Sequence, residues 1–340
     1  MNNKYKALFM YELKKLLWLF FAMVLFFILY SKLHSRSVVT EINNLITDTN
    51  HLSIDFKIFE PEFVFFYAAI VFILVYIQFN DGFNKLWHSL PFTNKEVLSI
   101  KLITGTFTIF SFVAAAGIIM LRDYYTYAEI YKDALTVLNI NPALINPFFI
   151  FKVMLSVFVV YLFMYFFTVL IQYIVGNCLS GICLSILLIH IPVLVIAGLN
   201  LFLKVPSSAV FTILPHYICS DVNLYDVNFF TNDSFEWVNA GIFSKYSIGA
   251  IIYYTILSVL SLFILIRVAV LPKWIEQSSP FSKNWIKYIF IAAFVIDFAM
   301  LSINMMYSIA APAKVITAVV FAVIGYIIAE FIIKRQGVNV

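Results

Sequence analysis

The residues of this chain that could do chemistry are ionisable side chains inside long apolar segments. Asp297 and His190 each stand well within such a segment, where a charge is costly to bury and therefore marks a candidate functional residue. One hypothesis is a proton relay through these two side chains. The other is that neighbouring helices satisfy them, since Asp297, Asn304 and Ser308 lie near one helical face. The sequence leaves both hypotheses open.

Motifs for several other kinds of chemistry are absent from the sequence. A P-loop needs Gly-Lys-Ser/Thr to hold phosphates, and none of the ten glycines is followed by Lys. His-Glu-x-x-His and Gly-x-Ser-x-Gly are absent as well. Cys178, Cys183 and Cys219 have neither a disulfide framework nor metal-ligand spacing. We therefore expect no catalytic site, bound cofactor or metal in this chain.

The composition is that of an integral membrane protein. Hydrophobic residues make up 63% of the 340 positions and charged residues 12%, and the mean hydropathy is +0.96. Soluble domains have about 25% charged residues. The net charge of +4 includes no concentrated basic run, so nucleic acid is not an expected partner.

The apolar segments predict an all-α fold with eight transmembrane helices. The segment 153–203 has no charged residue, and as one helix it would be ~75 Å long, so it must contain two spans with a turn at 176–181. The complete set of expected spans is 16–31, 63–80, 102–121, the two within 153–203, 246–266, 288–310 and 314–333. In the last span, small residues form a seam that permits close packing: Ala318, Ala322, Gly325 and Ala329.

The positive charges predict the orientation. With the N-terminus inside, 13 of the 22 Lys and Arg residues lie on the inner side, although the outer loops are much longer. The expected outer loops are 32–61, 122–147 and 204–245. Short apolar pieces in the last of these are either re-entrant helices or the core of a small loop subdomain. The sequence thus predicts a multi-pass protein of the cell membrane with both termini in the cytoplasm.

Residues 3–17 have the pattern of an amphipathic helix that precedes the first span. The pattern fits a helix on an anionic inner leaflet, and it fits equally a basic flank that orients the first span. The apolar face holds Tyr5, Leu8, Phe9, Leu13 and Leu16, and the polar side holds Lys4, Lys6, Glu12, Lys14 and Lys15.

The inner connection between the second and third spans is the most informative polar segment. Its first part has an apolar stripe at i, i+3, i+4 and i+7, opposite a polar face, and Pro91 ends this piece. The pattern predicts an interfacial helix, and an ordinary amphipathic loop is the alternative. The stripe is Phe83, Leu86, Trp87 and Leu90, and the polar face is Asn84, Lys85 and His88.

The second part of the connection has the start signals of a helix. Thr93 is the expected N-cap, Glu96 stands three residues later in a capping box, and Phe92 and Val97 occupy the positions of a hydrophobic staple. We expect this helix to continue through Lys101 into the third span.

Residues 88–101, His-Ser-Leu-Pro-Phe-Thr-Asn-Lys-Glu-Val-Leu-Ser-Ile-Lys, resemble a segment of ABC-2 type permeases. These are the membrane subunits of bacterial ABC exporters, and the shared features are Ser-Leu-Pro, Lys/Arg-Glu and a distant Lys. In that family the second-to-third connection is a coupling helix that docks on a separate ATPase subunit. The resemblance covers a six-span core at 1–267, with the coupling segment at 80–101 and the outer loop at 204–245. Residues 268–340 add a linker and two spans, as in some peptide-exporting and antibiotic-response relatives.

The resemblance implies a permease that moves a hydrophobic or amphipathic substrate outward: a peptide, an antimicrobial or a lipid-like molecule. ATP would bind the ATPase partner, and a second permease copy or a homologous permease would complete a dimer in contact with membrane lipids. A proton-coupled secondary transporter that uses Asp297 and His190 is the alternative. The residues that the resemblance assigns to ATPase coupling are Phe83, Lys85, Leu86, Trp87, His88, Leu90, Pro91, Thr93, Lys95, Glu96 and Lys101.

Overall fold

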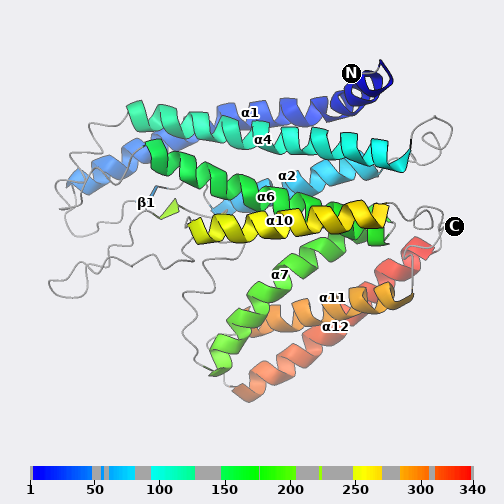
Figure 1. The fold of residues 1–340 in the computed structure, drawn as a ribbon. Coiled ribbons are helices and arrows are strands. Elements are labelled where there is room, and N and C mark those ends of the chain that lie inside the picture. The colour runs from blue at the N-terminus through cyan, green and yellow to red at the C-terminus, as the bar shows by residue number, and fades with distance from the viewer. Residues whose placement is uncertain are drawn as a thin grey trace.

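The structure is a computed structural model that describes residues 3–47, 55–56, 61–80, 93–126, 147–175, 177–203, 222–223, 248–269, 284–305 and 311–337. These residues form eight helices and one pair of two-residue strands (Figure 1). The helices are α1 (Asn3–Thr47), α2 (Pro61–Phe79), α4 (Asn94–Thr126), α6 (Pro147–Val175), α7 (Cys178–Leu203), α10 (Ile248–Ala269), α11 (Asn284–Met305) and α12 (Ala311–Gly337).

Five of these helices are long and apolar enough to cross a membrane. Their apolar spans are Lys95–Ile119, Met154–Val175, Ile251–Val268, Trp285–Ile303 and Pro312–Lys334, and shorter apolar helices cover Ala69–Phe79 and Cys178–Ile191. The predicted helical fold is therefore confirmed within the described residues, and these long apolar helices are compatible with a multi-pass membrane protein. The count of eight spans stays a prediction.

The helices lie roughly along one direction in an up-and-down arrangement. The chain reverses its direction from each helix to the next, and its N- and C-terminal ends lie toward the same end of the bundle (Figure 1). That same end holds the last turn of α2 and the first turn of α4, between which the expected coupling connection runs (Figure 1).

Helix α1 differs from the prediction because it is one continuous helix of 45 residues. The amphipathic N-terminal segment and the first span are joined without a break, and the helix continues into 32–47, which we expected to be a polar loop. That expectation was wrong. The physical reason is a helical spacing of apolar residues that the polar composition obscured: positions 38, 39, 42, 45 and 46 are Val, Val, Ile, Leu and Ile.

Two smaller boundaries also differ from the sequence prediction. Helix α4 continues to Thr126, into the segment expected to be the second outer loop. Helix α7 begins at Cys178, inside the expected turn at 176–181, because Asn177 caps it. The Asn177 carboxamide oxygen accepts a hydrogen bond from the amide of Ser180 at 3.2 Å, as a helix N-cap does.

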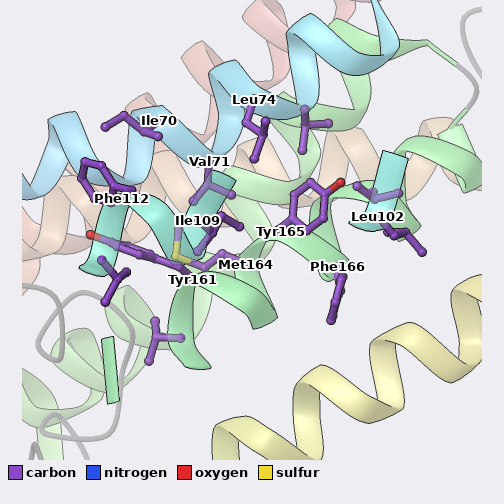
Figure 2. Packing of buried hydrophobic residues seen from close by; sticks show 14 of the residues in the cluster. Ile70, Val71, Leu74, Leu102, Ile109, Phe112, Tyr161, Met164, Tyr165 and Phe166 are labelled. Carbon is purple, nitrogen blue, oxygen red and sulfur yellow. The ribbon is translucent and has the colours of Figure 1, made fainter. Parts of the chain in front are cut away.

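The buried apolar side chains form two clusters. The larger cluster is built by α1, α2, α4, α6, the first turn of α7, and α10, and its largest fully buried side chains include Tyr161, Tyr165 and Phe112 (Figure 2). The smaller cluster joins the last turn of α6 and the first half of α7 to α11 and α12. Helix α12 packs mainly on α11, and most of its large apolar side chains are exposed, as expected for a surface that faces lipid.

The interface between α11 and α12 depends on small residues. A Cβ atom on Gly325 would lie 2.7 Å from the Phe294 carbonyl oxygen and 3.1 Å from Cβ of Phe298. Ala329, one turn further along α12, is fully buried. This confirms the predicted small-residue seam at Gly325 and Ala329, where the two backbones approach closely.

The strand pair was not predicted. Strand β1 (Asp55–Phe56) lies in the connection between α1 and α2, and β2 (Val222–Asn223) lies in the connection between α7 and α10. The strands are antiparallel, with Asp55 opposite Asn223 and Phe56 opposite Val222. The pair therefore fastens two sequence-distant connections to each other.

Candidate functional site

A cluster of buried polar side chains lies where α2 ends and α4 begins. Its members come from four helices, and each has less than one tenth of its surface exposed. They are Glu12 from α1, Gln78 from α2, Lys101 and Thr104 from α4, and Tyr165 from α6. We refer to these five residues as the inner polar cluster.

The first turn of α4 is fixed by a capping box. The Thr93 amide donates to Glu96 Oε2 at 2.8 Å, and the Glu96 amide donates to Thr93 Oγ1 at 3.3 Å. This confirms the predicted cap and satisfies two amide groups that the helix leaves without partners. Phe92, expected in the accompanying staple, lies outside the described residues.

Helix α1 contacts the same capping box. The Tyr5 hydroxyl donates to Glu96 Oε1 at 2.5 Å. This hydrogen bond to a carboxylate, together with a smaller desolvation effect and the nearby negative charge, raises the pKa of Tyr5 above its ordinary value. Tyr5 therefore stays a protonated donor at neutral pH, and it joins the N-terminal end of α1 to the start of α4.

Lys101 is the cationic centre of the inner polar cluster. Its Nζ lies 3.0 Å from Glu12 Oε1, with side-chain exposures of 5% and 1%, so the ion pair is screened very little by solvent. The same Nζ donates to the backbone carbonyl of Gln78 and lies 4.9 Å from the ring centroid of Phe79. One ammonium group thus contacts both α1 and the last turn of α2.

The backbone carbonyl of Lys101 is surrounded by side-chain donors. It accepts from the Tyr165 hydroxyl at 2.9 Å, from Gln78 Nε2 at 3.0 Å and from Thr104 Oγ1 at 3.0 Å. Tyr165 also lies 2.8 Å from Gln78 Oε1, to which its hydroxyl donates. These bonds connect α2, α4 and α6 at one point.

Gly105 makes room for the Tyr165 ring against α4. A Cβ at position 105 would lie 2.2 Å from the Tyr165 hydroxyl oxygen and 2.3 Å from Cζ. Only a residue without a side chain fits here, because Tyr165 is fully buried and cannot move into solvent. Tyr165 belongs to the same buried cluster as Leu74 of α2 and Leu102 of α4 (Figure 2).

The residues that the sequence assigns to ATPase coupling fall into two groups. The first group lies at the start of α4: Thr93 is the N-cap, and Lys95, Glu96 and Lys101 follow within the helix. Lys95 is exposed, whereas Lys101 is directed into the bundle. The second group lies outside the described residues and consists of Phe83, Lys85, Leu86, Trp87, His88, Leu90 and Pro91. The coupling role of both groups stays a prediction.

The predicted intramembrane polar residues lie on two helices that pack together. His190 is on α7, Asp297 is on α11, and both side chains are half-buried. Among the described residues no hydrogen bond reaches the buried Asp297 Oδ1. Asn304 lies near the end of α11, and Ser308 lies outside the described residues. The structure thus places His190 and Asp297 on neighbouring helices without a direct contact between them in the described part of the chain.

The sequence analysis missed four members of the inner polar cluster: Glu12, Gln78, Thr104 and Tyr165. We placed Glu12 on the polar side of its helix, but it lies within the buried stripe that includes Leu8 and Leu16. The signal was the position of Glu12 midway between these two leucines, four residues from each. Gln78, the last polar residue of an apolar span, carried a similar signal, whereas Tyr165 was hidden among many aromatic residues.

No family model, curated protein or solved structure matches this chain. Within the described residues there is also no group of three His, Cys, Asp or Glu side chains that could hold a metal ion. The inner polar cluster consists of amide, hydroxyl, ammonium and carboxylate groups that are engaged mainly with one another. It is suited to fixing the relative positions of helices.

Proposed function

We propose that this chain is the permease subunit of an ATP-driven ABC exporter, with ATP hydrolysis on a separate subunit. The substrate would be hydrophobic or amphipathic, such as a peptide, an antimicrobial or a lipid-like molecule. The proposal starts from the resemblance of residues 88–101 to the coupling segment of ABC-2 type permeases.

One structural observation supports the proposal most directly. Both ends of the connection at 81–92 are attached to the bundle by buried polar groups: Gln78 on one side and Lys101 on the other, where the exposed Thr93 cap also fixes the first turn of α4. A coupling segment must pass a displacement on to the membrane helices. Flexible attachments would absorb that displacement, whereas these attachments are short and rigid.

The inner polar cluster extends this attachment to two further helices. Lys101 pairs with Glu12 of α1, and Tyr165 of α6 bonds to both Gln78 and the Lys101 carbonyl. A movement of the connection would therefore act on α1, α2, α4 and α6 together. Rigid-body movement of a group of helices is a common way to alternate access in transporters.

The proposed assembly contains two permease copies, or this chain with a homologous permease, above two ATPase subunits. Both chain termini would lie in the cytoplasm, as the positive-inside count favours. Residues 1–267 would form the six-span core, and 268–340 would add two spans, of which α11 packs beside α7 and α12 packs on α11. ATP would bind only the partner subunits.

The experiment that tests the proposal is purification of the chain from its native membrane, with identification of any bound ATPase. Trp87→Ala should weaken this assembly because an aromatic side chain is a frequent hot spot of an interface. Trp285→Ala, on α11 at a half-exposed position, is the matched control and should leave assembly unchanged. Purification of the parent without an ATPase, or equal ATPase yield with both variants, would contradict the proposal.

A proton-coupled secondary transporter is the second candidate, and it is favoured by the half-buried Asp297, one of whose oxygens has no hydrogen-bond partner among the described residues. The amide of Asp297→Asn cannot carry a proton, so it would abolish proton-coupled transport but preserve ATP-driven export. Export by the parent and by Asp297→Asn should be measured in vesicles, with and without an uncoupler. We expect the variant to remain active with ATP. Loss of export in the variant, with uncoupler sensitivity in the parent, would favour the secondary transporter.

A further inference from the structure

The Lys101 carbonyl oxygen is surrounded by more hydrogen-bond donors than it can accept from at once. A carbonyl oxygen has two lone pairs, and in a helix one of these normally faces the amide four residues on. Three side chains also donate to it, each at 2.9 to 3.0 Å. Each donor has an alternative acceptor nearby: Gln78 Oε1 for Tyr165, Thr104 Oγ1 for the Gln78 amide, and the Ile100 carbonyl for Thr104.

The Glu12 carboxylate in the same cluster has too few hydrogen-bond donors. Its side chain is 1% exposed, and it forms an ion pair with Lys101 at 3.0 Å. Among the described residues neither carboxylate oxygen receives a well-aligned hydrogen bond. The inner polar cluster therefore combines an excess of donors at one carbonyl with a shortage of donors at a buried charge. In a low-dielectric interior such a network is sensitive to the positions of its groups, because each contact is strong and each missing partner is costly.

Stability alone does not account for a pair of this kind. Replacing a buried ion pair with apolar side chains of similar volume is often neutral or stabilising, because the charges no longer need to be desolvated. What an apolar replacement removes is the directional contact that sets how α4 lies along α1. In coiled coils, a single buried polar contact of this kind fixes the register of the helices.

We infer that Glu12 and Lys101 form a positioning lock that holds the start of α4 in one place along α1. The hydrogen bonds around the Lys101 carbonyl provide the exchangeable part of this lock. When the start of α4 moves, each of the three donors can form its hydrogen bond to its alternative acceptor instead, so that no buried donor is left unpaired. These donors are Tyr165, Gln78 and Thr104. The role of the lock in transport rests on the proposed exporter function, whereas its geometry does not.

The geometry can be tested by measuring the distance between α1 and α4. Spin labels at Lys6→Cys and Lys95→Cys, two exposed positions near the helix ends, would be placed on the full chain in lipid nanodiscs after its three native cysteines are replaced. We expect a narrow distance distribution in the parent. The apolar double variant Glu12→Met/Lys101→Met should fold with an unfolding midpoint at or above that of the parent, but with a broader or shifted distribution.

Lys101→Arg is the matched variant, because its guanidinium keeps the positive charge beside Glu12 and a donor for the Gln78 carbonyl, and it should keep the narrow distribution. A parent-like distribution in the apolar double variant would overturn the inference, since the pair would then not be needed for position. A distribution in Lys101→Arg as broad as in the apolar variant would also overturn it. Single apolar variants are less suitable here because they leave one charge buried without its partner.

A second measurement connects the lock to transport. If the exporter proposal holds, the apolar double variant should still copurify with the ATPase, while substrate export per ATP hydrolysed falls by about tenfold, within the usual range of coupling between sites. Unchanged export in that variant would overturn the functional part of the inference. A parent that neither binds an ATPase nor exports would contradict the proposed function instead, and the distance measurement would still decide whether the lock exists.

Discussion

Gly105→Ala is a small change that should strongly disturb the inner polar cluster. The added methyl group would lie 2.2 Å from the Tyr165 hydroxyl oxygen, and the ring cannot move into solvent because Tyr165 is fully buried. We expect the ring to shift and to lose the hydrogen bond that its hydroxyl proton shares between Gln78 Oε1 at 2.8 Å and the Lys101 carbonyl at 2.9 Å.

The magnitude follows from three contributions. Overpacking in a well-packed interior destabilises by about 1–3 kcal/mol. The hydrogen bond of the single Tyr165 hydroxyl proton, shared between two acceptors, contributes about 0.5–1.5 kcal/mol. The better helix propensity of Ala offsets about 1 kcal/mol. The net loss expected for Gly105→Ala is therefore roughly 0.5–3.5 kcal/mol in the free energy of unfolding, centred near 2.

The matched control is Gly117→Ala on the same helix. A Cβ at position 117 would meet only Cγ and Sδ of Met154, at 3.0 and 3.2 Å, and an unbranched methionine side chain can adjust. We expect this variant to remain within about 1 kcal/mol of the parent, because the propensity gain is the same and the clash is mild.

The assay is unfolding of the three proteins in mixed micelles, followed by tryptophan fluorescence and circular dichroism. A Tyr165→Leu/Gly105→Ala double variant should lose less than the sum of the two single variants, because the clash disappears with the ring. Equal unfolding midpoints for Gly105→Ala and Gly117→Ala would refute the reasoning. Full additivity in the double variant would refute it as well.

Two further predictions concern the rest of the chain. Gly325→Val should destabilise by about 2 kcal/mol or more because the backbones of α11 and α12 already lie in contact, and Val323→Ala on the exposed side of α12 is its control in the same unfolding assay. Cysteines at Asn139 and Ser278, both outside the described residues, test the orientation. An impermeant thiol reagent should label the first in intact cells but the second only after permeabilisation, and the reverse pattern would invert the topology.

The helices could be predicted from the sequence because lipid leaves few alternatives. A long apolar run without charges must form a helix, since its backbone groups have no water to bond to. Local start signals were equally clear: the capping box at Thr93 and Glu96 has the predicted geometry. The small-residue seam was predictable because Gly325 and Ala329 stand one turn apart on an otherwise bulky helix.

The inner polar cluster could not be predicted because it depends on which helices meet. The hydrogen bonds between its helices join residues 23 to 87 positions apart, and no local pattern pairs Gln78 with Lys101 or with Tyr165. Glu12 was misplaced because a charged residue is normally assigned to the polar face of a helix, and only its ion pair with Lys101 makes burial acceptable. The end of α1 was misplaced because polar composition was weighted above apolar spacing.

The strand pair between β1 and β2 has a consequence for the order in which the chain can reach its final structure. Phe56 is synthesised early, but its partner Val222 follows 166 residues later by their numbering. At ~5–20 residues per second, translation separates the two strands by about 10–30 s. During that interval α2, α4, α6 and α7 are all synthesised, whereas the backbone groups of β1 cannot yet pair with β2. The strand pairing must therefore be a late step, because it can form only after about two thirds of the 340 residues have been synthesised.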